Sequence, residues 1–363
     1  MIAGRMSKRD QEIVEAFRRQ STFCSSRNAE FTAAIITACA DEIEARGALY
    51  DVVKDFVGDP DKGALALRIA GALHWLHLSG RVEDDLAQLY ERTPRDADLA
   101  MLRPAISKVV VLEREMFDYF VSNTPQTNEV KRAAALLLGF SKIFEQTQKP
   151  LELFELGASG GLLLAWDQFR FDFGAFEWGE KGPVITAEWR GSPPDLAPTI
   201  PVAGRRGCDL NPMNLEDAEQ LLIANSYIWP EDRARRALFN EAVKQAAAAP
   251  IAIEQANAVD WLKNAAPSPK PGVTTVVYHS VFGVYLNRSE RAQLDNVFAT
   301  LADLATKEAP VARLSFEMEE TDQGLQFFLD LEMWPNVGKR GEKTRLARAH
   351  HHGAWVEPLH GSA

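Results

Sequence analysis

The sequence predicts an α/β protein in which an all-helical N-terminal domain precedes a doubly wound, mostly parallel sheet. Up to residue 148, apolar residues recur every three or four positions, which is typical of amphipathic helices. From residue 149 on, short apolar runs alternate with helical segments, which is typical of a parallel sheet with crossover helices. We therefore expect a helical domain over residues 1–148 and an α/β domain over residues 149–363.

Composition narrows the class of protein. The chain has 363 residues, enough for two modest cores, and its 46% apolar and 25% charged residues are typical of globular proteins. A net charge of −11 without a long basic run argues against nucleic acid as a partner. Cys24, Cys39 and Cys208 form no disulfide framework or metal pair, and no signal segment or membrane-spanning apolar run is found. We expect a cytoplasmic protein that contacts neither nucleic acid nor membrane.

Capping side chains, glycines and prolines set the ends of the expected helices in the first domain. The first helix begins at a capping box of Ser7 with Asp10, and the second is capped by Asn28 and ends at Gly47. A third helix is expected over 61–79, and a long one after Asp98 that bends at Pro104. The last helix is expected to begin near Thr127 or Asn128 and to end at Pro150.

Seven strands are expected in the second domain. In chain order they are 151–156, 202–209, 251–256, 273–279 and 311–317, closed by an antiparallel pair at 325–333 and 345–356 that a glycine- and lysine-rich turn joins. Three helical segments are expected. The first begins with residues 160–168, the second covers 216–248, and the third runs from Ser289 to Lys307.

Alternation and turn residues predict a β-hairpin inserted at 169–190. It carries six aromatic residues, namely Phe169, Phe171, Phe173, Phe176, Trp178 and Trp189. So many aromatic residues on a small insertion suit a lid over a pocket or a protein–protein interface.

The turn after the first expected strand is the most informative segment. Glu155 ends the strand, and Gly157, Ala158, Ser159 and Gly161 follow it before an apolar helix. Small residues there let the backbone approach a ligand closely, and the helix start offers free N–H groups. This arrangement is typical of nucleotide-type cofactor sites. The alternative is a tight turn without a ligand.

Two further acids follow the next two strands. Asp209, followed by Leu210, ends the second strand, where a carboxylate can hold a ribose diol; the alternative is an Asp-initiated turn before a proline. Asp260 follows the third strand, where it could accept from an adenine amino group, with Trp261 or Val259 against the ring. The alternative for Asp260 is a helix N-cap.

These three motifs in this order resemble class I S-adenosylmethionine-dependent methyltransferases. The resemblance implies a seven-stranded sheet with an antiparallel edge, Gly157 and Gly161 at the methionine part of the cofactor, Asp209 at its ribose and Asp260 at its adenine. The chain departs from that pattern because Ser159 replaces the middle glycine. The first two motifs also lie about fifty residues apart, against roughly twenty in compact nucleotide-binding units.

A second resemblance extends over nearly the whole chain. The stretches F-R-R-Q (17–20), T-N-E-V-K-R (127–132), E-L-G-A-S-G-G (155–161), G-C-D-L-N-P (207–212), Y-I-W-P (227–230), H-S-V-F-G-V-Y-L (279–286) and H-G-A-W-V (352–356) resemble the family of bacterial domains of unknown function numbered 2332. That family is grouped with methyltransferase-like folds and has no assigned activity.

His279 is the candidate catalytic residue, because it ends the fourth strand, where open α/β sheets bind ligands. In a methyltransferase-like site a neutral imidazole there could remove a proton from a nucleophilic oxygen or nitrogen. The alternative is a hydrogen-bonded structural histidine. Asn128 and Arg132 begin the helix before the first strand, and Arg132 could meet a carboxylate such as the methionine tail. Their alternatives are helix capping by Thr127 or Asn128 and a solvated face.

No metal site is expected. On a strand, only His350 and His352 of the three consecutive histidines share a face, and a third ligand is missing. His74 and His77 have a spacing that would allow a metal pair, but helix packing explains them as well.

We therefore expect an S-adenosylmethionine-dependent methyltransferase that acts on an unknown small molecule. One alternative is a methyltransferase-like binding or interaction module without catalysis. A weaker alternative is a dinucleotide-dependent oxidoreductase, which the broken glycine pattern disfavours.

Overall fold

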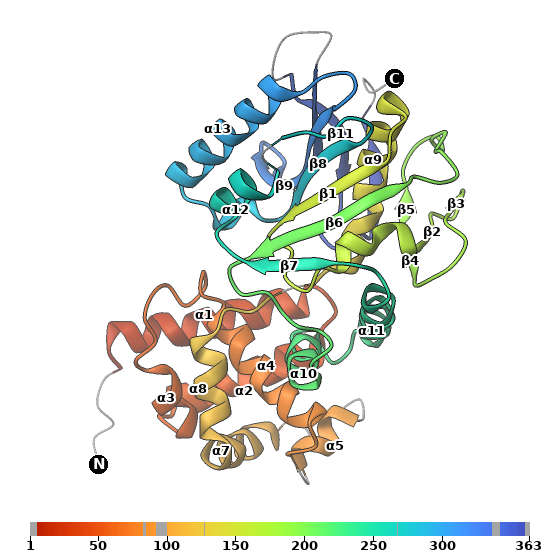
Figure 1. Ribbon diagram of the computed structural model, residues 1–363. Helices are drawn as coiled ribbons and strands as arrows, with labels where there is room; N and C mark the ends of the chain where they lie inside the picture. The colour runs from red at the N-terminus through yellow and green to blue at the C-terminus, as the bar shows by residue number, and fades with distance from the viewer. Residues whose placement is uncertain are drawn as a thin grey trace. The chain divides into compact units, whose positions relative to one another are not determined.

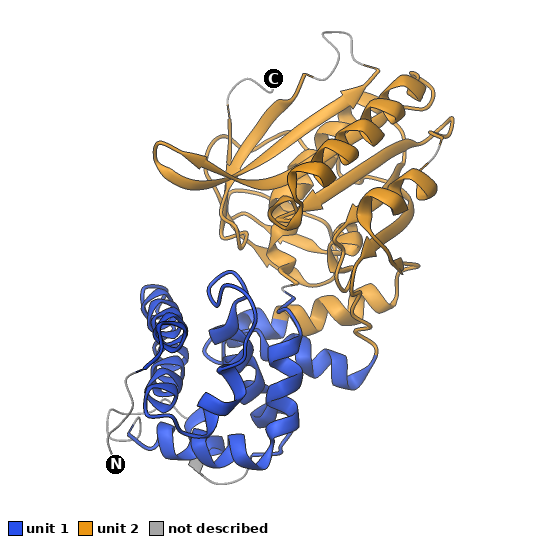
Figure 2. Cartoon of the chain, turned by 90° about the vertical axis from the view of Figure 1, so that its left-hand side faces the viewer, with its two compact units in different colours: residues 1–127, 217–237 blue, residues 128–216, 238–363 orange. Residues whose placement is uncertain are grey.

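The computed structural model describes residues 6–82, 85–91, 100–126, 128–266, 268–335 and 342–359. The chain folds into two compact units (Figure 2): unit 1 is residues 1–127 and 217–237, and unit 2 is residues 128–216 and 238–363. This division differs from the expected boundary at residue 148. The helix before the first strand belongs to unit 2, and a segment from the second half of the chain belongs to unit 1.

The described part of unit 1 contains helices and no strand. They are α1 (Lys8–Ser25), α2 (Glu30–Glu44), α3 (Ala48–Val53), α4 (Leu65–Leu78), α5 (Asp85–Glu91), α7 (Leu102–Leu112), α8 (Arg114–Ser122), α10 (Ala218–Ser226) and the first residues of α11 (Arg233–Ala247). Fully buried Phe17, Phe117 and Phe120 help to form the core of this unit.

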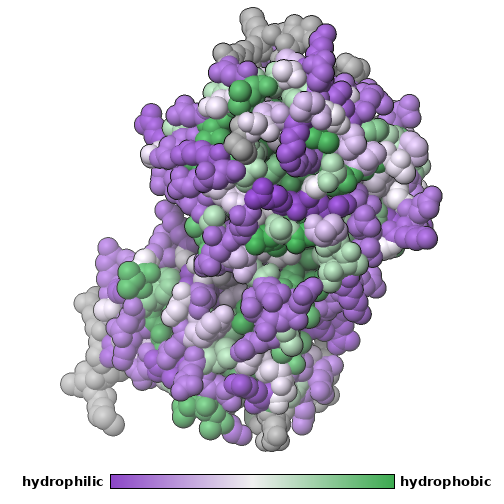
Figure 3. Space-filling view, viewed as in Figure 1, coloured by the Kyte–Doolittle hydropathy of each residue, from purple (hydrophilic) through white to green (hydrophobic). Residues whose placement is uncertain are grey.

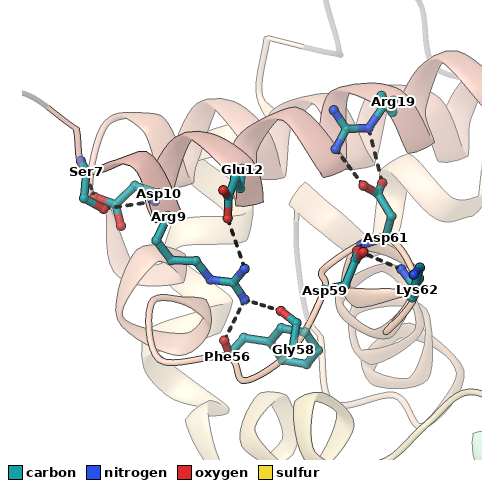
Figure 4. A network of polar contacts seen from close by, with 10 residues as sticks. All are labelled: Ser7, Arg9, Asp10, Glu12, Arg19, Phe56, Gly58, Asp59, Asp61 and Lys62. Atoms are coloured by element: carbon teal, nitrogen blue, oxygen red, sulfur yellow. Dashed lines mark hydrogen bonds and ion pairs between the residues drawn. The ribbon is translucent and has the colours of Figure 1, made fainter.

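Polar contacts fix the start of α1 (Figure 4). The Ser7 hydroxyl accepts from the Asp10 N–H and the Asp10 carboxylate accepts from the Ser7 N–H, so the predicted capping box is confirmed. Arg9 donates to the carbonyl oxygen of Phe56 at 2.8 Å, and Arg19 pairs with Asp61 at 2.6 Å. These bonds tie the first turn and the second half of α1 to the segment that leads into α4.

One predicted helix cap and one predicted helix bend in unit 1 are wrong. The N-cap of α2 is Ala29, because Asn28 lies in the left-handed region with a φ of 59°. The expected bend at Pro104 is not there; the break between α7 and α8 is at Glu113. Proline is tolerated near the start of a helix, where its missing N–H has no intrahelical acceptor to lose. Asp98 and Thr127 lie outside the described residues.

The segment 217–237 completes unit 1. The carboxylate of Glu231 accepts from both the N–H and the hydroxyl of Thr32, at 2.8 and 2.7 Å, and so caps α2. The carbonyl oxygen of Ser226 lies 3.0 Å from Nδ1 of His74, and burial lowers the pKa of His74 to about 4. His74 is therefore neutral and serves packing within unit 1.

Unit 2 contains a nine-stranded sheet and not the seven strands expected (Figure 1). Its strands, in spatial order, are β5 (Glu188–Trp189), β12 (Trp355–Pro358), β11 (Thr344–Ala349), β10 (Gly324–Trp334), β9 (Val311–Thr321), β8 (Thr274–Ser280), β1 (Leu151–Leu156), β6 (Val202–Asp209) and β7 (Ala252–Gln255). Strands β7, β6, β1, β8 and β9 are mutually parallel, β10, β11 and β12 each run antiparallel to the preceding strand, and β5 pairs parallel with β12. The sheet is therefore mostly parallel, as predicted.

The closing antiparallel part has three strands where a pair was expected. The segment 345–356 is not one strand, because a turn at 350–353 separates β11 from β12. The expected turn between β10 and β11 falls partly on residues 336–341, which lie outside the described residues.

Helices cover both faces of the sheet (Figure 1). On one face, α12 (Ala258–Ala265) and α13 (Arg288–Leu304) share a core with Phe154 of β1 and Val277 of β8. On the other face lie α9 (Ala133–Thr147) and a 3-10 helix η2 (Leu162–Gln168) in place of the expected α-helix, with Phe140 stacked on Trp166 at 4.5 Å. The N-cap of α13 is Asn287, not Ser289.

The insertion at 169–190 is more than the predicted hairpin. It forms a small sheet in the order β3 (Glu177–Trp178), β2 (Arg170–Asp172), β4 (Val184–Thr186), and β5 joins the main sheet. Five of its six aromatic side chains are buried, and Trp178 stacks on Trp166 at 5.6 Å. These aromatic residues are core, which argues against the expected lid or interface.

Polar residues cover much of the visible surface, with apolar side chains scattered among them (Figure 3). Among the helices that the structure describes, none is both long enough and apolar enough to cross a bilayer.

Candidate functional site

The parallel strands of unit 2 define a topological switch point between β1 and β8. From β1 the chain continues to β6 and β7 on one side, and then returns to β8 and β9 on the other. In open α/β sheets, ligands bind outside the carboxyl ends of the strands at such a point. The register pairs Leu156 with both Cys208 and His279, so the predicted site residues that follow these strands share one edge of the sheet.

The turn after β1 has an unusual backbone. Gly157, Ser159 and Gly161 all have left-handed φ angles, of 70°, 50° and 72°. The N–H groups of Gly157 and Ala158 both donate to the carbonyl oxygen of Cys208 at 2.9 Å. A side chain at Gly161 would meet Ile253, 2.7 Å from an added Cβ. Glycine is thus required at Gly161 for two reasons, and Ser159 bears strain that glycine would avoid.

Two predicted residues hold this turn from outside. The Asp209 carboxylate accepts from the Ser159 N–H and from the Asn211 N–H, each at 2.9 Å. The side-chain oxygen of Asn128 accepts from the Gly160 N–H at 3.0 Å. The structure therefore brings Asn128 and Asp209 together at the turn, although 81 residues separate them in the chain. Asn128 does not cap a helix; the carboxylate of Glu129 does.

Glu155 lies near the end of β1, just before the turn, and is buried. It is 3% exposed, and one carboxylate oxygen accepts from the Tyr278 hydroxyl at 3.1 Å. Burial raises the pKa of Glu155 to about 8, helped by the charge of Asp209 and opposed by the Tyr278 hydrogen bond and the charge of Arg132. Glu155 is therefore largely protonated at neutral pH.

His279 lies at the predicted position and is oriented by Glu317. Its Nδ1 is 2.6 Å from Oε1 of Glu317, the ring is 4% exposed, and Nε2 has no hydrogen-bond partner among the described residues. Burial acts to raise the pKa of Glu317, but the bond and charge of His279 and two backbone N–H groups lower it below its ordinary value. The pair resembles the orienting carboxylate and base of general acid–base sites.

The segment after β8 covers this edge. Val281 has a φ of 54°, which is rare for a β-branched residue. The Phe282 ring lies 5.7 Å from the His279 ring and 2.6 Å from the position of a Cβ on Gly157. Strained residues of this kind concentrate at functional sites.

Sequence reasoning missed Glu317, Val281 and Phe282. A signal for Glu317 existed, because the fifth expected strand ended on it. The rule that singled out Asp209, an acid at the carboxyl end of a parallel strand, applies equally to Glu317.

Arg132 lies at the same edge but contacts backbone. It donates to the carbonyl oxygens of His351 at 3.0 Å and Ser280 at 3.3 Å. Arg132 thereby ties the turn before β12 to the end of β8, and its charge lies near Glu155.

The candidate cofactor residues that follow β6 and β7 are in positions that suit cofactor binding less well. Leu210 is 64% exposed, and its carbonyl oxygen accepts from Gln255 at 3.0 Å. Asn257, and not Asp260, caps α12; Asp260 is exposed in the first turn and lies 3.4 Å from Lys263. Trp261 is buried in the core with its ring 6.1 Å from that of Phe154, so it does not line the edge of the sheet.

The histidines near the C-terminus lie in the turn between β11 and β12, where the strand alternation does not apply. Nδ1 of His350 accepts from the His352 N–H at 3.2 Å. Within the described ranges, no group of three His, Cys, Asp or Glu side chains could hold a metal ion.

The chain was compared with protein families, curated proteins and solved structures. No curated protein and no solved structure is significantly similar to the chain. One family does match, over residues 14–357. The chain belongs to this family, which is described as "Uncharacterized protein conserved in bacteria (DUF2332)".

Proposed function

We propose that the chain binds S-adenosylmethionine at the carboxyl edge of β1 and transfers its methyl group to a small molecule. One observation carries the proposal: the Ser159 N–H donates to the Asp209 carboxylate at 2.9 Å. This bond joins the turn after the first strand to the acid after the second strand, at the switch point of the sheet. These are the elements on which the resemblance to class I methyltransferases depends.

Features of this edge fit such a cofactor. Two backbone N–H groups orient the Asp209 carboxylate, and a ribose diol would donate to it. Asn128 contacts the same turn and Arg132 contacts the end of β8; both would contact the amino-acid end, whereas Asp260 would accept from adenine. When bound, S-adenosylmethionine supplies a methyl carbon on a sulfonium, and the C–S bonding pair leaves with the sulfur.

His279 would be the general base for the methyl acceptor. Its Nε2 would accept the proton that leaves a hydroxyl or amine of the acceptor, and general-base assistance contributes about 10²–10⁴-fold to a rate. Because Nε2 is buried beside Phe282, the Phe282 ring would move to admit the acceptor.

A second candidate is a methyltransferase-like binding module without catalysis. The Phe282 ring favours it, because this ring covers Gly157, the residue expected to contact the methionine part of the cofactor. The burial of Trp261 favours it too, since an adenine ring would lose that stacking partner.

Isothermal titration calorimetry of the full chain tests cofactor binding. We expect saturable binding of S-adenosylmethionine, at least tenfold weaker in Asp209→Asn, because a hydrogen bond to a charged group contributes about 1.5–3 kcal/mol. Asp195→Asn, an exposed carboxylate on the loop between β5 and β6, is the matched control and should bind normally. Absence of binding at millimolar concentration would refute the proposal.

Methyl transfer separates the two candidates. We expect methyl-tritiated S-adenosylmethionine to label small molecules of a bacterial extract, with incorporation about 10² lower or more in His279→Asn. His77→Asn, in unit 1, should retain full incorporation. Cofactor binding without any labelling would select the binding module.

A further inference from the structure

We propose that Glu317 is the positioning residue of this edge: one carboxylate oxygen fixes the tautomer of His279 and also anchors the strained turn that carries Phe282. The catalytic purpose of this orientation rests on the proposed function, but the orientation of His279 itself can be tested without a cofactor. It adds to the proposed function a residue that sequence reasoning did not identify.

Three nitrogen atoms lie within hydrogen-bond distance of Oε1 of Glu317. They are Nδ1 of His279 at 2.6 Å, the Phe282 N–H at 2.9 Å and the Gly283 N–H at 3.1 Å. Backbone N–H groups can only donate and an ionised carboxylate can only accept, so Oε1 acts as an acceptor in all three bonds. Nδ1 must therefore carry the proton of a neutral His279 ring, and Nε2 must carry the lone pair.

The second ring nitrogen of His279, Nε2, indicates the purpose of this orientation. Nε2 of His279 is fully buried and has no hydrogen-bond partner among the described residues. Buried acceptors without a partner are uncommon in native proteins, and each needs an explanation. A lone pair held ready for a proton from a bound acceptor is such an explanation, because a structural histidine would use both ring nitrogens.

The same oxygen holds the covering segment in place. Val281 has a φ of 54°, and its N–H donates to the carbonyl oxygen of Phe316 at 2.8 Å. A β-branched residue keeps this conformation only when its surroundings enforce it. The bonds of Phe282 and Gly283 to Glu317 supply that enforcement, and an added Cβ on Gly283 would lie only 3.1 Å from the carboxylate.

A purely structural role would explain the two backbone bonds but not a fixed tautomer. Glutamine at position 317 separates hydrogen bonding from charge, because its carbonyl oxygen can accept from the same three donors while the negative charge is lost. Alanine removes both the three hydrogen bonds and the charge. Glu320→Ala is the matched control, since Glu320 is an exposed acid on the same strand.

The test is nitrogen NMR of the full chain labelled with ¹⁵N-histidine, with the His279 signals assigned by their loss in His279→Asn. We expect the neutral wild-type ring to show a protonated Nδ1 and an Nε2 that carries no proton. Glu317→Gln and Glu320→Ala should keep this pattern, and Glu317→Ala should lose it. A protonated Nε2 in the wild-type spectrum would overturn the inference, whether or not Glu317→Ala folds.

This outcome is independent of cofactor binding. If S-adenosylmethionine fails to bind but Nδ1 is protonated, the proposed function falls and the orientation by Glu317 stands. If the cofactor binds and Nε2 is protonated, the reverse holds.

Discussion

Burial of Glu155 makes the stability of unit 2 depend on pH, and Glu155→Gln should remove that dependence. Glu155 is 3% exposed, and the hydrogen bond from Tyr278 lowers its pKa less than burial raises it. Its pKa in the folded chain is about 8, against an ordinary value of 4.5. Glutamine keeps the shape and an oxygen that can accept from Tyr278, but it cannot be ionised.

The pKa difference fixes both the sign and the size of the effect. Between pH 4.5 and 8 the folded state keeps the proton of Glu155 and the unfolded state loses it, so folding binds a proton. Stability is therefore full below pH 4.5, falls by about 1.4 kcal/mol per pH unit through this window and levels off above pH 8. The total loss is on the order of 5 kcal/mol.

Urea denaturation at pH 5 to 9, followed by tryptophan fluorescence, measures this loss. Most of the tryptophans belong to unit 2, so the signal reports mainly on that unit. We expect Glu155→Gln to match the wild type near pH 5 and to be more stable by several kcal/mol at pH 9. Glu180→Gln, on an exposed loop, should follow the wild type. An equal slope in Glu155→Gln and wild type would refute the reasoning.

Three other variants test the geometry of the site. Asp209→Ala should lower the free energy of unfolding of unit 2 by about 2–4 kcal/mol in urea, since two backbone N–H groups lose a charged acceptor. Asp260→Ala, which removes an exposed side chain, should lower the free energy of unfolding by about 0.5 kcal/mol or less. Equal losses of stability in Asp209→Ala and Asp260→Ala would contradict the different roles of these two carboxylates. Gly161→Ala should cost at least about 2 kcal/mol in thermal unfolding, because strain and a clash add. Gly174→Ala should cost about 1 kcal/mol, because its φ of 76° is similar but the space beside it is open. Phe282→Ala should tighten S-adenosylmethionine binding about tenfold in calorimetry by uncovering Gly157, and weaker binding would show that the ring is a ligand contact.

The strands of the parallel sheet could be predicted because each is a short apolar run between turn residues. The switch-point edge followed from the same signal, since the carboxyl ends of parallel strands share one edge. Asp209 was accordingly expected at this edge as a ribose ligand, and Asn128 near it at the start of the preceding helix; in the structure both contact the turn after β1. Their hydrogen bonds are to backbone, and a sequence pattern does not reveal that.

The remaining features of the fold depend on which elements pack together in three dimensions, and the spacing of apolar residues along the chain does not show this. The apolar residues of α10 indicate that this helix is partly buried, but not that it packs in unit 1. The aromatic residues of the insertion were expected at the surface, yet a pattern of large side chains is the same for a lid and for a core. Trp261 was misplaced for a similar reason, because α12 turns its apolar face, Trp261 included, toward Phe154.

The discontinuity of unit 1 constrains how this chain can be built. The residues that cap α2 and meet His74 leave the ribosome only after β1 and β6 have been made, because Ser226 and Glu231 follow both strands. Unit 1 thus cannot close its core during the first half of synthesis. A fragment cut at residue 148 would expose the face that α10 covers, so the helical half is not a portable module.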